Sequence, residues 1–100
     1  MVSGLNILMV EDDIGIGNWI KNKVEKLDTL STFTWATSIN DAFEVLKLTQ
    51  PDYIILDLQL PDGNGIEILK KIMEDKLPIK TFVFTINIGL KNACLRWGAD

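Results

Sequence analysis

A chain of 100 residues, 47% of them hydrophobic, is large enough for one domain with a modest core. The net charge of −4 argues against a nucleic-acid binder, the single Cys94 excludes an internal disulfide, and the absence of histidine excludes a Ser-His-Asp triad and a zinc-finger site. No apolar run reaches the roughly 18 residues of a membrane span and the N-terminus lacks a basic signal-peptide start, so we expect a soluble, cytoplasmic domain.

The first third of the chain alternates strand-like and helix-like patterns. Residues 5–10 (LNILMV) form an apolar run that ends in three acids, which predicts a first strand. Trp19 widens the apolar side of a predicted helix, whose stripe at helical spacing consists of Ile16, Ile20, Val24 and Leu27. Residues 32–36 (TFTWA) alternate hydroxyl and larger apolar side chains, which is typical of a half-exposed strand near a sheet edge.

The middle of the chain contains the strand around which we expect the sheet to be built. Ser38 is placed to cap a second helix, with Asp41 as in a capping box. The apolar face of this helix consists of Ile39, Ala42, Phe43 and Leu46, and the helix ends before Pro51. Residues 53–57 (YIILD) are apolar on both faces up to Asp57, which predicts a parallel strand covered by helices on both sides.

The last part of the chain continues the alternation. A turn is predicted over residues 58–65, followed by a helix with Ile66, Leu69, Ile72 and Met73 on one face. Residues 80–85 predict a fourth strand, and a last helix carries Leu90, Ala93, Cys94 and Trp97. The order βαβαβαβα predicts one α/β domain over residues 1–100, with a doubly wound parallel sheet and right-handed crossovers.

Acids gather at the predicted carboxyl ends of the strands, in Glu11-Asp12-Asp13 and around Asp57 and Asp62. If the first and third strands are neighbours, their tips lie about 5 Å apart, and Glu11, Asp12 and Asp57 converge on one spot. Carboxylates that face one another raise one another's pKa values, and a divalent cation relieves the repulsion. Oxygen ligands favour Mg²⁺, Mn²⁺ or Ca²⁺, and Mg²⁺ leaves positions free for phosphate oxygens. This pattern indicates phosphoryl chemistry with a carboxylate nucleophile.

Each of these residues also has a purely structural interpretation. Asp57 alone could end the strand or cap the next helix. Asp13 directly precedes the first helix, and we expect it to cap that helix. The Thr85 hydroxyl could donate to a phosphoryl oxygen on Asp57 or bond to local backbone. Gly63 and Gly65 are interpreted as turn residues only.

Taken together, these residues resemble the receiver domain of two-component response regulators over essentially the whole chain. Glu11 and Asp12 match the acidic pair, and Asp57 with the loop Leu60-Pro61-Asp62-Gly63 matches the phosphoacceptor region. Thr85 matches the switch hydroxyl. The resemblance implies a flavodoxin-like fold with strand order 2-1-3-4, four βα units of an expected five, so that the fifth strand and last helix lie beyond Asp100.

The resemblance also implies a mechanism. A sensor histidine kinase or phosphotransfer protein would phosphorylate Asp57, with Mg²⁺ held by Asp12, Asp57 and the backbone carbonyl of Gln59, and Glu11 acting partly through water. The charge on Asp57 would draw Thr85 inward and alter partner binding. The chain would be a signalling domain and not an enzyme. Three departures are Glu11 in place of the usual Asp, Ile86 in place of a small residue, and a lysine expected beyond Asp100.

Two alternatives remain open. A phosphohydrolase with an aspartyl nucleophile would need a second Asp at the position of Gln59, which cannot transfer protons. A receiver-like interaction module that works without phosphorylation is compatible with Ile86 and the missing lysine. In addition, residues 82–84 (FVF) on the fourth strand would form an apolar edge, which predicts self-association by edge pairing or domain swapping.

Overall fold

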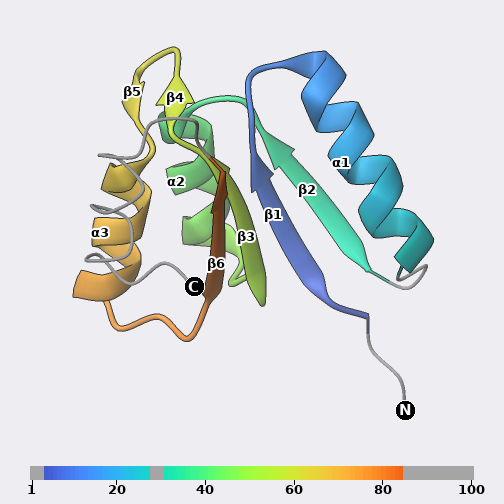
Figure 1. Ribbon diagram of the computed structural model, residues 1–100. Helices are drawn as coiled ribbons and strands as arrows, with labels where there is room; N and C mark the ends of the chain where they lie inside the picture. Colours follow the sequence, from blue (N-terminus) through green and yellow to red (C-terminus); the bar gives the residue numbers. More distant parts are fainter. Residues whose placement is uncertain (1–3, 28–30, 85–100) are drawn as a thin grey trace.

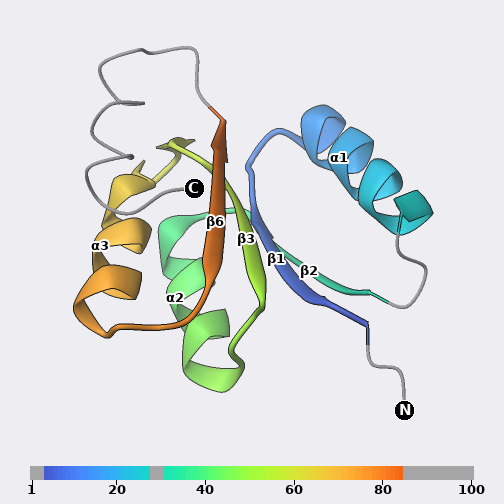
Figure 2. The same ribbon diagram turned by 60° about the horizontal axis from the view of Figure 1, so that its bottom comes forward.

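A computed structural model describes residues 4–27 and 31–84 of the protein, which form a parallel sheet with helices on both faces (Figure 1). The strands of this sheet are β1 (Asn6–Val10), β2 (Thr32–Ala36), β3 (Tyr53–Asp57) and β6 (Lys80–Phe84). Their order is β2-β1-β3-β6, which confirms the predicted flavodoxin-like order 2-1-3-4. The helices are α1 (Ile14–Leu27), α2 (Ile39–Leu48) and α3 (Ile66–Glu74). Helix α1 covers one face, and α2 and α3 cover the other (Figures 1 and 2).

The register of the strands brings the ends of β1 and β3 to one edge. Val10 lies opposite Ala36 on one side and Leu56 on the other. The ladder continues one residue beyond β1, because the Glu11 N–H donates to the Ala36 carbonyl at 3.0 Å. The first residues after β1 therefore lie beside Asp57, the last residue of β3.

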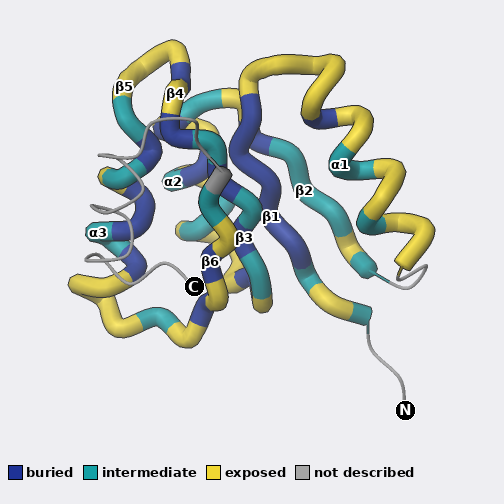
Figure 3. The backbone as a smooth tube through the Cα atoms, in the orientation of Figure 1, coloured by how far each residue is buried: buried dark blue, intermediate teal, exposed yellow. Residues whose placement is uncertain are grey.

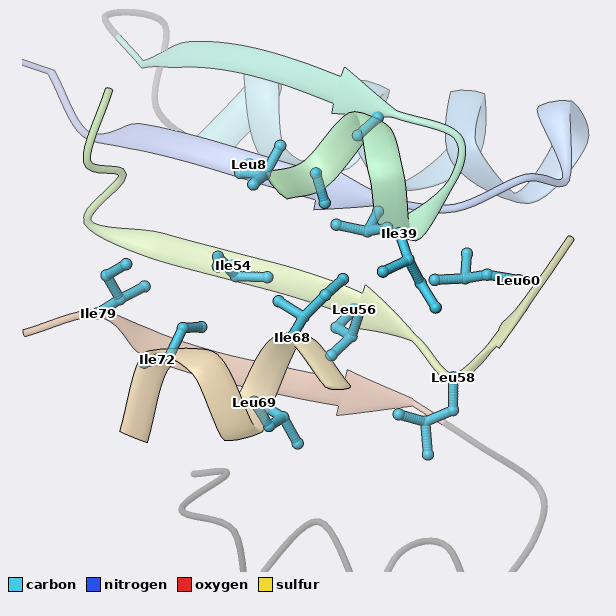
Figure 4. Packing of buried hydrophobic residues seen from close by; sticks show 13 residues of the cluster. Leu8, Ile39, Ile54, Leu56, Leu58, Leu60, Ile68, Leu69, Ile72 and Ile79 are labelled. Carbon is cyan, nitrogen blue, oxygen red and sulfur yellow. The ribbon is translucent and has the colours of Figure 1, made fainter. Parts of the chain in front are cut away.

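The core lies between the sheet and helices α2 and α3. Leu8, Val10, Ile54 and Leu56 are fully buried on the sheet side. Figure 4 shows side chains of α2 and α3 meeting them, and the helical members of the cluster are Ile39, Ala42, Ile68, Leu69 and Ile72. Full burial of such a side chain contributes about 1.5–3 kcal/mol. Of the predicted α3 face, Leu69 and Ile72 are confirmed, whereas Met73 is 53% exposed and Ile68 takes the inward position.

The α1 face of the sheet is covered more loosely. Most of β1 is buried and most of α1 is exposed (Figure 3). The predicted apolar side of α1 is wrong at three positions, because Ile16, Trp19 and Leu27 are 46%, 64% and 88% exposed. The buried residue of α1 is Gly17, against which the ring of Trp35 lies. Beside α1, an apolar groove of about 230 Å³ is lined by Leu5, Ile7, Val24, Leu27, Tyr53, Ile55 and Phe82.

The predicted turn after β3 is a small antiparallel hairpin of β4 (Gln59–Leu60) and β5 (Gly63–Asn64). Gly63 has a φ of 147°, a conformation that side chains rarely adopt. A Cβ on Gly65 would lie 2.6 Å from the Asp57 carbonyl oxygen. The two glycines are therefore required by the turn, as predicted, and Gly65 also lets α3 begin directly against the end of β3.

The start of helix α2 agrees with the sequence. The Ser38 hydroxyl accepts the Asp41 N–H at 3.1 Å, which confirms the predicted cap of α2.

Among the described residues, no helix has the length and apolar character needed to cross a membrane. Thr85, Ile86 and the predicted helix at residues 90–97 lie outside the described residues.

Candidate functional site: an acidic pocket at the ends of β1 and β3

Three carboxylates from two neighbouring strand ends meet at the carboxyl edge of the sheet. Glu11 and Asp12 follow β1, and Asp57 ends β3. One oxygen of each of these residues lies within 4.8 Å of the others. The predicted convergence of Glu11, Asp12 and Asp57 is therefore found in the structure.

Glu11 is the buried member of the group, with 1% of its surface exposed. Its Oε1 accepts the Asp13 N–H at 3.0 Å, whereas its buried Oε2 has no hydrogen-bond partner among the described residues. Burial, helped by the nearby carboxyls of Asp57 and Asp12, raises the pKa of Glu11 from 4.5 to about 7, against the opposing effect of the Asp13 N–H. Near neutral pH this buried side chain is therefore partly protonated.

Asp57 and Asp12 are the more accessible members. Asp57 is half-buried and Asp12 is exposed. The Gln59 N–H donates to Asp57 Oδ1 at 3.2 Å, so one carboxylate oxygen is oriented by the backbone of the following hairpin. This contact places Gln59 beside the pocket through its N–H. The role of its carbonyl as a metal ligand stays a prediction.

Two neighbouring acids do not join the pocket. Asp13 Oδ1 accepts the Ile16 N–H at 2.9 Å, which confirms the predicted cap of α1. Asp62 faces the start of α2, where its carboxylate accepts the N–H groups of Ile39 at 2.8 Å and Asn40 at 3.0 Å. These two bonds lower the pKa of Asp62. The expectation that Asp62 shares an acidic field with Asp57 is therefore corrected, because its charge is directed to a helix N-terminus.

One residue that contacts the pocket was missed by the sequence analysis. The indole N–H of Trp35 donates to the backbone carbonyl of Glu11 at 2.8 Å. In the sequence, Trp35 is only an aromatic residue of a half-exposed strand. Its position one residue before the end of β2, opposite Met9 of β1, is the signal that places it near the strand tips.

The donor set suits a hard divalent cation. All three side chains offer carboxylate oxygens, and the Glu11 oxygen without a partner is buried at the cost of its hydration. Coordination would relieve both that cost and the repulsion among the three charges. Mg²⁺ in such a site keeps some positions for water or for phosphate oxygens, whereas zinc prefers nitrogen and sulfur ligands.

Comparison with known proteins points to one family. The family model described as the response regulator receiver domain matches residues 7–100. Among curated proteins, the chain is 29% identical over 98 residues to a protein-glutamate methylesterase/protein-glutamine glutaminase of Geobacillus kaustophilus, covering 95% of the chain and 28% of that protein. It is 32% identical over 101 residues to the transcriptional regulatory protein CiaR of Streptococcus pneumoniae, covering 96% of the chain and 42% of that protein. The chain thus spans less than half of these two relatives.

Solved structures give the same result. The MaeR response regulator bound to beryllium trifluoride has a TM-score of 0.79 and 31% identity, with 95% of this chain and 80% of that chain covered. The non-phosphorylated HemR receiver domain from Leptospira biflexa has a TM-score of 0.77 and 30% identity, with 95% and 77% covered. The similarity therefore extends over nearly the whole of this chain in both sequence and fold.

Proposed function

Because this chain belongs to the response regulator receiver family, we propose that it accepts a phosphoryl group on Asp57 from a histidine kinase or phosphotransfer protein. The observation that carries the proposal is the meeting of Glu11, Asp12 and Asp57 oxygens within 4.8 Å at the ends of β1 and β3. A lone strand-end aspartate would need no such companions. The phosphoryl donor and any downstream output are likewise proposals, because this chain spans less than half of the two curated relatives described above.

The chemistry assigned to Asp57 is nucleophilic attack on phosphorus. The Gln59 N–H holds Oδ1, which leaves Oδ2 as the attacking oxygen. A new bond forms between this oxygen and phosphorus as the bond from phosphorus to the donor's nitrogen breaks, and the donor nitrogen leaves with the bonding electrons. Half-burial of Asp57 gives the donor access while limiting competition from water.

Mg²⁺ is the cofactor proposed for this step, and it would neutralise charge on the transferred phosphoryl oxygens when bound. Asp12 and Asp57 are proposed as its carboxylate ligands, with the Gln59 carbonyl as a backbone ligand and Glu11 acting partly through water. Without the ion Glu11 is partly protonated near neutral pH, since burial and its acidic neighbours raise its pKa to about 7. Binding of the ion and loss of that proton should therefore be coupled.

Labelling with acetyl phosphate tests the phosphoacceptor role. We expect Mg²⁺-dependent incorporation of one phosphoryl group in the unmodified protein and none above background in Asp57→Asn. Asp62→Asn is the matched control, because this acid lies in the same loop region but faces α2. Labelling that persists in Asp57→Asn would contradict the proposal. A protein that neither binds Mg²⁺ nor becomes labelled would instead favour an interaction module that works without phosphorylation.

Receiver domains are generally not enzymes in their own right. We therefore do not propose for this chain any of the activities for which its relatives are named.

Thr85 is proposed as the switch residue that responds to the phosphorylated Asp57. In Thr85→Ala, we expect acetyl phosphate labelling to persist while phosphorylation no longer changes partner binding. Loss of labelling in that variant would assign Thr85 to the transfer step instead.

Self-association through β6 is a further proposal. Among the described strands, β6 pairs only with β3, and Phe82 on it is 47% exposed and stacks on Tyr53 with ring centroids 5.7 Å apart. Light scattering over a concentration series should show a mass that increases with concentration, and Phe82→Lys should reduce it. A strictly monomeric mass at high concentration would contradict this proposal.

A further inference from the structure

Trp35 connects the acidic pocket to two other parts of the fold. Its backbone belongs to β2, its ring lies against Gly17 of α1, and its indole N–H donates to the Glu11 carbonyl at 2.8 Å. The Glu11 N–H donates in turn to Ala36, the neighbour of Trp35, at 3.0 Å. Both backbone polar groups of Glu11 are thus held by consecutive residues of β2.

The carbonyl that Trp35 holds has a special position in the pocket. It belongs to the peptide group that joins Glu11 to Asp12, the two acids contributed by the β1 end. A peptide group is planar, so fixing the direction of its carbonyl also fixes the position of the next Cα atom. The relative placement of the Glu11 and Asp12 side chains therefore depends on the orientation of this one peptide.

The position of the Trp35 ring depends on the lack of a side chain at Gly17. A Cβ at this buried position would overlap the six-membered part of the indole ring. Glycine in a helix costs about 1 kcal/mol relative to alanine. At this position the absence of a side chain leaves room for the Trp35 ring, whose N–H reaches the Glu11 carbonyl.

We propose that Trp35 is a positioning residue of the acidic pocket, which orients the Glu11–Asp12 peptide for cation binding and requires Gly17 to do so. This inference rests on the proposed Mg²⁺ site and adds to it a residue that touches neither the cation nor the phosphoryl group. Groups that orient metal ligands typically change metal affinity about 10–100-fold when they are removed.

Trp35→Phe tests the inference, because it keeps an aromatic ring and removes the N–H donor. We expect Mg²⁺ affinity, measured by calorimetric titration of the intact chain, to fall about tenfold. Trp19→Phe is the matched control on the exposed side of α1, and Ile79→Val is a core control at the opposite edge of the sheet. Both controls should retain the affinity of the unmodified protein, and an equal loss in Ile79→Val would assign the effect to general destabilisation.

A measurement without Mg²⁺ separates this inference from the proposed function. In the unmodified protein labelled with ¹⁵N, the Trp35 indole proton should exchange with water at least tenfold more slowly than that of the exposed Trp19. The Asp13 amide proton, which donates to Glu11 Oε1, should lose protection in Trp35→Phe but not in Trp19→Phe. An unprotected Trp35 indole proton, or an unchanged Asp13 amide, would overturn the positioning role whether or not Mg²⁺ binds.

If the protein binds no Mg²⁺ but both protons behave as expected, the proposed function fails and the positioning of the Glu11–Asp12 peptide is supported. If Mg²⁺ binds and Trp35→Phe binds it with unchanged affinity, the positioning role fails and the proposed function stands. Gly17→Ala provides a second variant, since the added methyl group should displace the ring and lower Mg²⁺ affinity in the same direction.

Discussion

Acidic side chains that lie within a few residues of one another in the sequence have two different roles in this fold. Glu11, Asp12 and Asp57 bring their oxygens within 4.8 Å of one another. Asp13 and Asp62 each accept backbone N–H groups at the start of a helix, α1 for Asp13 and α2 for Asp62. The first group therefore gathers negative charge, and the second group neutralises helix N-termini.

The difference follows from what each carboxylate faces. Helix N-termini offer free N–H donors, so a carboxylate there is stabilised in its charged form, as the lowered pKa of Asp62 indicates. Strand ends of a parallel sheet offer no such cluster of donors, and acids from adjacent strands face one another. Burial and this proximity raise the pKa of Glu11 to about 7. A functional role is therefore expected for an acid whose charge destabilises the fold, such as Glu11, and a structural role for an acid whose charge stabilises it, such as Asp62.

The largest expected effect is on phosphoryl transfer. Asp57→Asn removes the proposed nucleophile, and labelling by acetyl phosphate should fall to background, whereas Asp62→Asn should retain it. Incorporated label is measured by mass spectrometry of the intact chain. Equal loss of labelling in both variants would mean that the two groups of acids are not separate in function.

The next effect is on cation binding. Asp12→Asn removes the charge of an exposed side chain that is proposed as an oxygen ligand, so Mg²⁺ affinity in calorimetric titrations should fall at least about tenfold. Asp13→Asn is the adjacent control, because asparagine caps helices about as well as aspartate and keeps the N–H that holds Glu11. A similar loss of affinity in Asp13→Asn would show that general negative charge, not coordination, attracts the ion.

Much of this arrangement was predictable from the sequence, because strand order and strand ends determine it. The apolar run at residues 53–57 and its counterpart at 5–10 predicted two central strands, and the acids that end them then had to meet. The course of the hairpin at residues 59–64 was not predictable in the same way. Asp57 and Asp62 flank one loop, and only the packing of that hairpin against α2 turns Asp62 away from the pocket.

The inward face of α1 was also not predictable from apolar periodicity. A count of apolar side chains gives no weight to glycine, yet Gly17 is the residue buried against the sheet and Ile16 is 46% exposed. The reason lies in Trp35, whose ring fills the space at Gly17. Complementary shapes on distant segments leave no periodic pattern, so the pocket's contact with Trp35 was found only in the structure.

A third effect concerns the pH dependence of stability without a cation. The folded-state pKa of Glu11 is raised above its ordinary value of 4.5 to about 7. The folded protein therefore binds more protons than the unfolded chain between these pH values, and stability falls as pH rises through that window. We expect a loss of roughly 1–3 kcal/mol in the free energy of unfolding between about pH 4.5 and 7 from this group.

Glu11→Gln should remove most of this slope, because glutamine does not titrate, and saturating Mg²⁺ should reduce it in the unmodified protein. Urea unfolding followed by circular dichroism, at several pH values with and without Mg²⁺, measures both effects. The result opposed to this expectation is a free energy of unfolding that rises over the same pH range and rises equally in Glu11→Gln.

The smallest effect belongs to the capping acids. Asp13→Ala removes the acceptor for the Ile16 N–H and should lower the free energy of unfolding by about 1 kcal/mol. Mg²⁺ affinity should change less than in Asp12→Asn, because alanine still offers the backbone N–H that donates to Glu11 Oε1. Asp13→Asn should restore stability by restoring the cap. If Asp13→Ala weakened Mg²⁺ binding as much as Asp12→Asn while stability stayed unchanged, Asp13 would belong with the acids of the pocket. The division into pocket acids and capping acids would then be wrong.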